Sequence, residues 1–230
     1  MATHILLTGG SRGIGAAIAA TLHERGAKVF AAASADADLS SAGGPALLWE
    51  KALERLDGRV DVLINNAGIF EASPLDGPDE VWMEEWRRTM TINLEASASL
   101  CRSAVLEWGG AGITGRIINV ASRAAYRGDS PAHWHYAASK AGMVGMTKTI
   151  ARGYAAEGIL AFAICPGFTM TGMADDYLAS RGGDALLADI PLGRVAEPGE
   201  IATIAAFLAL DAPPSMTGAI IDANGASYVR

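Results

Sequence analysis

The chain has 230 residues, half of them hydrophobic, and a formal net charge of −7. This length and composition predict a single domain, residues 1–230, built around one large core. The acidic balance, without a dense run of Lys or Arg, argues against nucleic acid or an anionic membrane surface as a partner, so a small molecule is expected. Without a bilayer-length apolar stretch or a basic leader, the sequence predicts a cytoplasmic protein with reduced, buried thiols at Cys101 and Cys165.

Short apolar runs alternate with longer amphipathic segments along the chain. The pattern predicts strands at 4–8, 28–33, 60–65, 115–120, 159–164 and 217–222, and helices at 13–25, 45–57, 79–108, 134–157 and 198–210. This order is typical of an α/β fold with a doubly wound (Rossmann) parallel sheet, whose strands are apolar throughout because helices cover both faces. Ligands of such sheets bind beyond the carboxyl ends of the strands, so the loops that follow the strands are the candidate site.

A glycine-rich turn follows the first expected strand, and it leads into an apolar helix. Gly9, Gly13 and Gly15 permit a tight turn, close approach of the backbone to a pyrophosphate and close helix packing. The free N–H groups and the positive dipole at the start of the helix favour a phosphate there. The turn therefore predicts a dinucleotide site, with candidate contacts at Gly9, Ser11, Arg12, Gly13, Ile14 and Gly15.

The end of the second expected strand bears on which dinucleotide binds. The strand ends in Ala33 and Ser34, where an NAD enzyme usually presents Asp or Glu to the ribose hydroxyls. With no carboxylate there to repel a 2′-phosphate, and with Arg12 able to pair with one, NADP(H) is favoured over NAD(H), with Ser34 as a further contact. Two alternatives stay open: Arg12 as a solvated loop arginine, and Asp36 as a ribose ligand.

Four further motifs stand in order along the chain: Asn65-Asn-Ala-Gly68, Thr91-Ile-Asn93-Leu94, Ser122 behind a strand, and Tyr136-Ala-Ala-Ser-Lys140. Together with the glycine turn they closely resemble the short-chain dehydrogenase/reductase family, and in particular its oxoacyl-carrier-protein reductase-like members. The likeness extends to Pro166-Gly167 and to the C-terminal segment 217–222, so it covers nearly the whole chain. It implies an NADP(H)-dependent oxidoreductase that interconverts a ketone and a secondary alcohol.

The residue chemistry agrees with this activity. Tyr136 and Lys140 are four residues apart and share a helix face, so the ammonium is expected to lower the pKa of the phenol. Tyr136 is then the expected general acid and base, and Ser122 the group that holds the substrate oxygen. The resemblance further implies that Lys140 holds the nicotinamide ribose and that Asn93 anchors a water that relays protons. A buried structural amide is the alternative for Asn93.

The resemblance also assigns the remaining cofactor contacts. They are Asn66, Ala67 and Gly68 at the ribose, Pro166, Gly167 and Thr169 at the nicotinamide carboxamide, and Asp38 and Leu39 at the adenine. Only 25 residues separate Ser34 from Val60, where the family usually fits a helix, a third strand and a second helix. A parallel crossover needs a dozen or more residues, so we expect the usual helix after the second strand to be missing and the third strand to be shortened or lost.

The segment 123–135 is expected to form one wall of the substrate pocket. With Ser122, the candidate substrate contacts there are Tyr126, His133 and Trp134. The His-x-His spacing at 133 and 135 lacks acidic or cysteine partners, so no metal site is expected. The segment of about 168–197, rich in Gly and Pro, is expected to be a mobile lid; a decorated surface loop is the alternative.

Residues 107–114 and 155–157 are poor in positive charge, which would steer an acidic carrier protein only weakly. The expected substrate is therefore a free small-molecule ketone or secondary alcohol. Three alternatives remain: an oxoacyl-carrier-protein reductase, a non-catalytic NADP(H)-sensing regulator, and an isomerase or dehydratase that borrows the bound nicotinamide. The resemblance also implies a homodimer or homotetramer formed through helices 79–108 and 134–157, unless these helices only cover the sheet.

Overall fold

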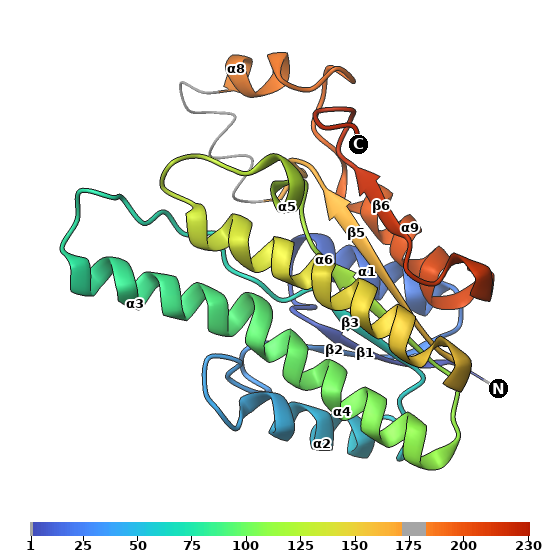
Figure 1. The fold of residues 1–230 in the computed structure, drawn as a ribbon. Helices are drawn as coiled ribbons and strands as arrows, with labels where there is room; N and C mark the ends of the chain where they lie inside the picture. Colours follow the sequence, from blue (N-terminus) through green and yellow to red (C-terminus); the bar gives the residue numbers. More distant parts are fainter. Residues whose placement is uncertain (1, 172–182) are drawn as a thin grey trace.

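A computed structural model describes residues 2–171 and 183–230 (Figure 1). They form a six-stranded sheet of order β2-β1-β3-β4-β5-β6 in which every neighbouring pair is parallel. The strands are β1 (His4–Thr8), β2 (Lys28–Ala32), β3 (Val62–Asn65), β4 (Gly115–Val120), β5 (Ile159–Pro166) and β6 (Ile220–Ala223). The expected doubly wound parallel sheet is confirmed.

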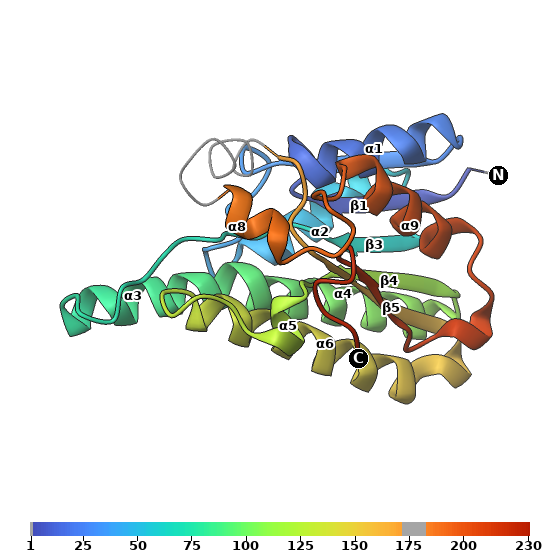
Figure 2. The ribbon, with the colours of Figure 1, turned by 90° about the horizontal axis from the view of Figure 1, so that it is seen from above.

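Helices cover both faces of the sheet. The helices are α1 (Gly13–Glu24), α2 (Gly44–Arg55), α3 (Asp79–Met90), α4 (Ala96–Ala111), α5 (Ala124–Arg127), α6 (Trp134–Tyr154), α8 (Gly183–Ala188) and α9 (Pro198–Leu210). Helices α1 and α9 lie on one face and α2, α4 and α6 on the other (Figures 1 and 2). One buried cluster joins α1 and α9 to the sheet and another joins α2, α4 and α6 to it, so each face has its own apolar layer.

The region after β2 departs from the usual family pattern as expected. Strand β1 pairs with β2 on one side and directly with β3 on the other, so β2 is the edge strand of the sheet that the structure describes. The chain turns as soon as β2 ends, because the Asp36 carboxylate accepts a hydrogen bond from the Ala33 N–H at 2.9 Å and Asp38 accepts one from the Ser40 N–H at 2.9 Å. Helix α2 begins at Gly44, and no strand forms between β2 and α2 in these described residues.

The helix expected at 79–108 is interrupted. A π-helical turn, Thr91–Glu95, separates α3 from α4, and Asn93 lies at its centre. Such single turns are frequent at functional sites. The strand expected at 217–222 begins later, at Ile220, because Gly218 has a left-handed backbone with φ of +87° and the Ala219 N–H turns back to the Met216 carbonyl at 2.9 Å.

Helices α3, α4 and α6, on which the expected subunit interface falls, lie together on one side of the molecule (Figure 1). Leu100, Met143 and Ile150 are buried within the protomer, so these side chains cover the sheet. Trp82 and Trp86 of α3 are only partly buried. The oligomeric state stays a prediction.

Eleven residues of the expected lid, 172–182, lie outside the described residues. The parts on either side pack against the body: Thr169 bridges Ala196, and Ile190 and Val195 form a small buried cluster with Phe168 and Met170. Cys101 and Cys165 are buried free thiols, as expected. In residues 2–171 and 183–230, no helix is both long and apolar enough to cross a membrane.

Candidate active site

The candidate site is built where β1, β3, β4 and β5 end. Thr8, Asn65, Val120 and Pro166 are the last residues of these four strands, and because the strands are parallel their ends lie at the same edge of the sheet. The loops that follow carry the glycine turn, the Asn-Ala-Gly segment, Ser122 and the Pro-Gly turn. All motifs that the sequence singled out at strand ends are therefore brought to one edge.

The glycine turn between β1 and α1 is packed too tightly for other residues. Gly9 has a left-handed backbone with φ of +67°, and a Cβ at Gly15 would lie only 2.0 Å from the carbonyl oxygen of Gly9. A Cβ at Gly10 would lie 2.6 Å from that of Ala31 in β2, a constraint that the sequence analysis did not identify. Arg12 is the N-cap of α1 but makes no side-chain capping hydrogen bond, which leaves the helix N-terminus to a phosphate.

The Asn66 loop is tied to the same turn. The Thr8 hydroxyl accepts hydrogen bonds from the backbone N–H groups of Asn66 at 3.0 Å and Ala67 at 2.9 Å. The Asn66 amide in turn donates to the carbonyl oxygens of Thr8 at 3.0 Å and Gly9 at 3.1 Å. These bonds hold Asn66, Ala67 and Gly68 beside the expected pyrophosphate turn.

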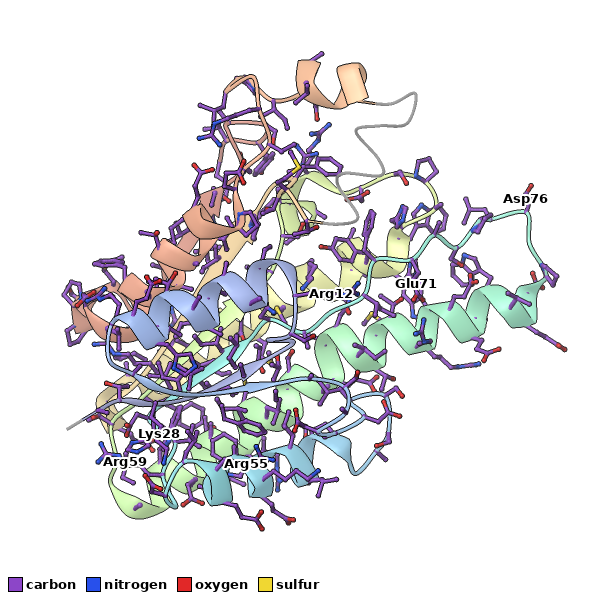
Figure 3. All side chains as sticks on the ribbon, turned by 180° about the vertical axis from the view of Figure 1, so that it is seen from behind. Arg12, Lys28, Arg55, Arg59, Glu71 and Asp76 are labelled. Carbon is purple, nitrogen blue, oxygen red and sulfur yellow. The ribbon has the colours of Figure 1, made fainter. Side chains whose placement is uncertain are left out.

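At the end of β2, Ser34 and Arg12 are exposed, and Figure 3 shows Arg12 at the start of α1. The Asp36 carboxylate, the alternative ribose ligand, is turned back onto the Ala33 N–H. Asp38 is exposed, and its carboxylate accepts hydrogen bonds from the N–H and hydroxyl of Ser40, which hold the pKa of Asp38 below its usual value. The expected adenine role of Asp38 and Leu39 stays a prediction.

Tyr136 and Lys140 lie on α6, next to the end of β4. The ammonium of Lys140 is buried, lies 5.8 Å from the centroid of the Tyr136 ring, and donates a hydrogen bond to the carbonyl oxygen of Val120 at 2.9 Å. Ser122 follows that strand and its hydroxyl is hydrogen-bonded to Tyr136. A Cβ at Gly68 would lie 3.6 Å from the Lys140 ammonium and 3.3 Å from the Asn93 amide oxygen. The four expected catalytic residues therefore lie in one cluster.

The expected lowering of the Tyr136 pKa is wrong for the protein alone. Burial raises the pKa of Tyr136 to about 12, and the hydrogen bond with Ser122 opposes this only in part. Burial also lowers the pKa of Lys140 to about 8. Desolvation is the largest cause for both groups, and it disfavours the charged form of each. Tyr136 is thus a neutral phenol that can donate a proton at neutral pH.

The side chain of Asn93 has a structural role. Its oxygen accepts a hydrogen bond from the Ile69 N–H at 2.8 Å, and its amide donates to the Ile69 carbonyl at 3.0 Å and to the Ser139 hydroxyl at 3.3 Å. The alternative interpretation of Asn93 as a satisfied buried amide therefore describes its side chain. The expected water relay stays a prediction.

Of the expected substrate contacts, His133 is linked to Tyr136 through Phe70. Phe70, which the sequence analysis missed, stacks on His133 with ring centroids 4.0 Å apart and meets the Tyr136 ring edge-on at 4.7 Å. Its position just beyond the Asn-Ala-Gly segment, at the edge where the strands end, is a signal that could have identified it. Burial lowers the pKa of His133, which favours its neutral form.

The other two aromatic candidates, Trp134 and Tyr126, contact rings other than that of Tyr136, and their substrate role stays a prediction. Trp134 is 54% exposed and packs edge-on against Trp82 of α3. Tyr126 stacks on Tyr228 near the C-terminus, and its hydroxyl accepts a hydrogen bond from Arg230 at 2.9 Å. Among the ring contacts between described residues, neither Trp134 nor Tyr126 meets Tyr136.

The turn after β5 is the last of the four strand-end segments that make up the candidate site. A Cβ at Gly167 would lie 2.8 Å from the Cα of Asn224, so this turn is packed against the strand end of β6. Thr169 is buried, and its hydroxyl donates to the Gly167 carbonyl at 3.3 Å. Arg123, which the sequence analysis did not single out, donates its backbone N–H to the Pro166 carbonyl at 2.9 Å.

A buried polar chain fixes α6 against the sheet. The Asn65 amide donates to the Asn119 side-chain oxygen at 2.9 Å, and the Asn119 amide donates to the Thr147 hydroxyl at 2.8 Å. Thr147 donates onward to the Met143 carbonyl at 2.8 Å. The chain links β3, β4 and α6, and so holds Tyr136 and Lys140 in register with Ser122. The polar Asn119 inside an apolar strand was the only sequence signal for it.

Comparisons with protein families agree with this architecture. A family described as short chain dehydrogenase matches residues 3–43, and one described as enoyl-(acyl carrier protein) reductase matches residues 32–225. The 3-oxoacyl-[acyl-carrier-protein] reductase FabG of Vibrio cholerae is 37% identical and covers 97% of this chain and 96% of its own. The acetoacetyl-CoA reductase of Rhizobium meliloti is 34% identical over 97% of each chain.

Solved structures of similar chains show the same fold. A blue fluorescent protein from a metagenomic library, in complex with NADPH, has a TM-score of 0.85 at 33% identity and covers 99% of this chain and 98% of its own. A chain from Beutenbergia cavernae assigned as an NAD(P)-dependent gluconate 5-dehydrogenase, with NADP bound, has a TM-score of 0.84 at 30% identity and covers 97% of this chain and 95% of its own.

Proposed function

The chain belongs to the short-chain dehydrogenase/reductase family, and we propose that it is an NADP(H)-dependent reductase that converts a free small-molecule ketone into a secondary alcohol. The family relation makes it an oxidoreductase that acts on CH–OH groups. The observation that carries the proposal is the cluster of Ser122, Tyr136 and Lys140 at the strand ends, with a neutral Tyr136 phenol. A neutral phenol is the form that a ketone reductase needs.

The residues present fit the cofactor. The glycine turn leaves no room for side chains at Gly9 and Gly15, and the uncapped N-terminus of α1 is suited to the pyrophosphate. Arg12 and Ser34 are exposed on the side where the 2′-phosphate of NADP(H) would lie. NADP(H) is also the cofactor in the two similar solved structures.

When bound, NADPH supplies the hydride that adds to the carbonyl carbon. Tyr136 donates its hydroxyl proton to the carbonyl oxygen, so that the ketone gains one hydride and one proton and becomes the alcohol. Ser122 donates a hydrogen bond to the same oxygen and orients it. Lys140, as an ammonium 5.8 Å from the Tyr136 ring, stabilises the phenolate that remains until a proton from solvent restores it.

Loss of the Tyr136 hydroxyl is the direct test of this mechanism. In Tyr136→Phe, ketone reduction is expected to fall by about 10²- to 10⁴-fold, the usual contribution of general acid catalysis. NADPH binding, followed by nicotinamide fluorescence, is expected to persist. Tyr154→Phe, at the far end of the same helix, is the matched control and should keep its activity. Full activity of Tyr136→Phe would remove Tyr136 from the mechanism.

An oxoacyl-carrier-protein reductase is the second candidate, because two carrier- or CoA-linked reductases are among the similar chains. The net charge of −7 opposes steering of an acidic carrier protein. The two candidates are separated by comparing kcat/KM for the same 3-oxoacyl group on a carrier protein and as a free acid or ester. A clear preference for the free compounds supports the proposal, and equal or better turnover of the carrier-linked form overturns it.

A further inference from the structure

Arg123 is a buried cation at the edge of the sheet where the candidate catalytic residues gather. It follows Ser122 in the chain, and its backbone N–H is bonded to the Pro166 carbonyl, so it spans the ends of β4 and β5. Its guanidinium lies over the Phe168 ring, 4.8 Å from the centroid. Only 9% of the residue is exposed. Arg123 is therefore held against the turn that the family resemblance places at the nicotinamide.

The charge of Arg123 is incompletely compensated. Its Nη1 atom is buried and makes no hydrogen bond within residues 2–171 and 183–230. The Asp189 carboxylate lies 3.5 Å from Nη1, but the same oxygen is hydrogen-bonded to Arg127. Two cations thus share one carboxylate, and Asp129 contributes attraction from farther away. Burial lowers the pKa of Arg123, which reflects the cost of desolvating its charge.

An anion on the ligand would offset the free-energy cost of burying the Arg123 charge. A guanidinium binds a carboxylate through two parallel hydrogen bonds, and such charge-assisted bonds are strong in a water-poor site. Because Arg123 follows Ser122 in the chain, an anion bound by its guanidinium would belong to the same small molecule as the reacting carbonyl. A carrier-linked oxoacyl group has a neutral thioester at that place, with its phosphate far away along the carrier arm.

We propose that Arg123 is a specificity-determining residue that binds a substrate carboxylate, so that the ketone reduced by this protein is an oxo acid. This inference rests on the proposed function and names its substrate class. The alternative is that Arg123 and Arg127 only clamp Asp189, the residue after α8, and so fix that segment. The two roles predict different results: if Arg123 binds the carboxylate, its loss lowers activity on charged ketones more than on neutral ones, and if it only clamps Asp189, both fall equally.

The test compares 2-oxo and 3-oxo acids with their methyl esters in the wild type and in Arg123→Met, with NADPH. The wild type should prefer at least one acid over its ester. Arg123→Met should lower kcat/KM for that acid about 100-fold more than for the ester, since a hydrogen bond to a charged group is worth up to about 3 kcal/mol. Arg123→Lys should restore part of the loss. Arg152→Met, at an exposed arginine of α6, is the matched control and should not change the acid-to-ester ratio.

Equal losses on acid and ester, or a wild type without preference for any acid, would overturn the inference and leave Arg123 as a clamp. Equilibrium binding of the same oxo acids to the NADPH-loaded protein, measured by calorimetry, separates this result from failure of the proposed function. Absence of turnover with acid binding that depends on Arg123 would reject the reductase and keep the carboxylate site. Absence of acid binding to the wild type would reject the site.

Discussion

Lys140 donates a hydrogen bond to the Val120 carbonyl at 2.9 Å while its ammonium lies 5.8 Å from the ring of Tyr136. The backbone of β4 thus fixes the lysine, and Ser122 two residues later contacts the same tyrosine. Burial moves the two pKa values apart, to about 8 for Lys140 and about 12 for Tyr136. At neutral pH both groups are protonated, which is the state that ketone reduction requires.

The pH dependence of reduction should therefore be set by Lys140. Its pKa is lowered, so it loses its proton near pH 8, whereas Tyr136 keeps its own to about pH 12. We expect kcat/KM to be level below pH 8 and to fall with a slope of one above it, because kcat/KM reports the groups of the enzyme before the ketone binds. Initial rates between pH 6 and 10 measure this limb.

Lys148→Met is the matched control for this profile, because Lys148 is an exposed lysine on the same helix. This variant should leave the alkaline limb near pH 8. A profile that stays level to pH 10 would show that Lys140 does not control the rate, and would contradict the stabilising role given to its ammonium.

The sheet and the positions of the motifs could be predicted because they depend on local pattern. Apolar runs alternate with amphipathic helices, and in a parallel sheet every strand end falls at one edge, so Thr8, Asn65 and Ser122 had to meet there. The loss of a strand after β2 followed from chain length alone. These inferences needed no knowledge of how distant side chains pack.

What depends on burial and on contacts distant in sequence could not be predicted. The pKa of Tyr136 rises because the phenol is desolvated, and spacing on a helix does not report desolvation. Phe70 reaches Tyr136 across 66 positions of sequence, and Arg123 meets Phe168 across 45. Trp134 and Tyr126 were expected at the substrate because they lie in the right segment, but their rings turn to α3 and to the C-terminus.

The choice of cofactor should depend on Arg12 and Ser34. Arg12→Ala is expected to weaken NADPH binding by about 10- to 100-fold, the range for a lost hydrogen bond to a charged group, with little effect on NADH. Ser34→Asp places a carboxylate at the exposed end of β2, where it would repel the 2′-phosphate and accept hydrogen bonds from the ribose of NADH. Fluorescence titration of each variant with both cofactors measures the change.

Arg152→Ala, which removes an exposed arginine from α6, is the control for net charge and should bind NADPH as the wild type does. A wild type that binds NADH more tightly would instead mean that Asp36 leaves the Ala33 N–H and serves the ribose. Equal weakening of both cofactors by Arg12→Ala would show that Arg12 acts on the shared pyrophosphate and not on the 2′-phosphate.

The buried chain from Asn65 through Asn119 to Thr147 should contribute measurably to stability. Thr147→Val keeps the size of the side chain but removes the acceptor of the Asn119 amide, which would be left buried without a partner. The free energy of unfolding is expected to fall by about 1–3 kcal/mol, the cost of one unsatisfied buried polar group. Urea unfolding gives this value from the midpoint and slope.

Thr149→Val is the matched control for this variant. Thr149 is exposed on the same helix, and among the described residues it bonds only the Gly145 carbonyl. We therefore expect its free energy of unfolding to change by no more than about 0.5 kcal/mol. Similar losses in both variants would mean that side-chain shape on α6, and not the polar chain to β4, determines the effect.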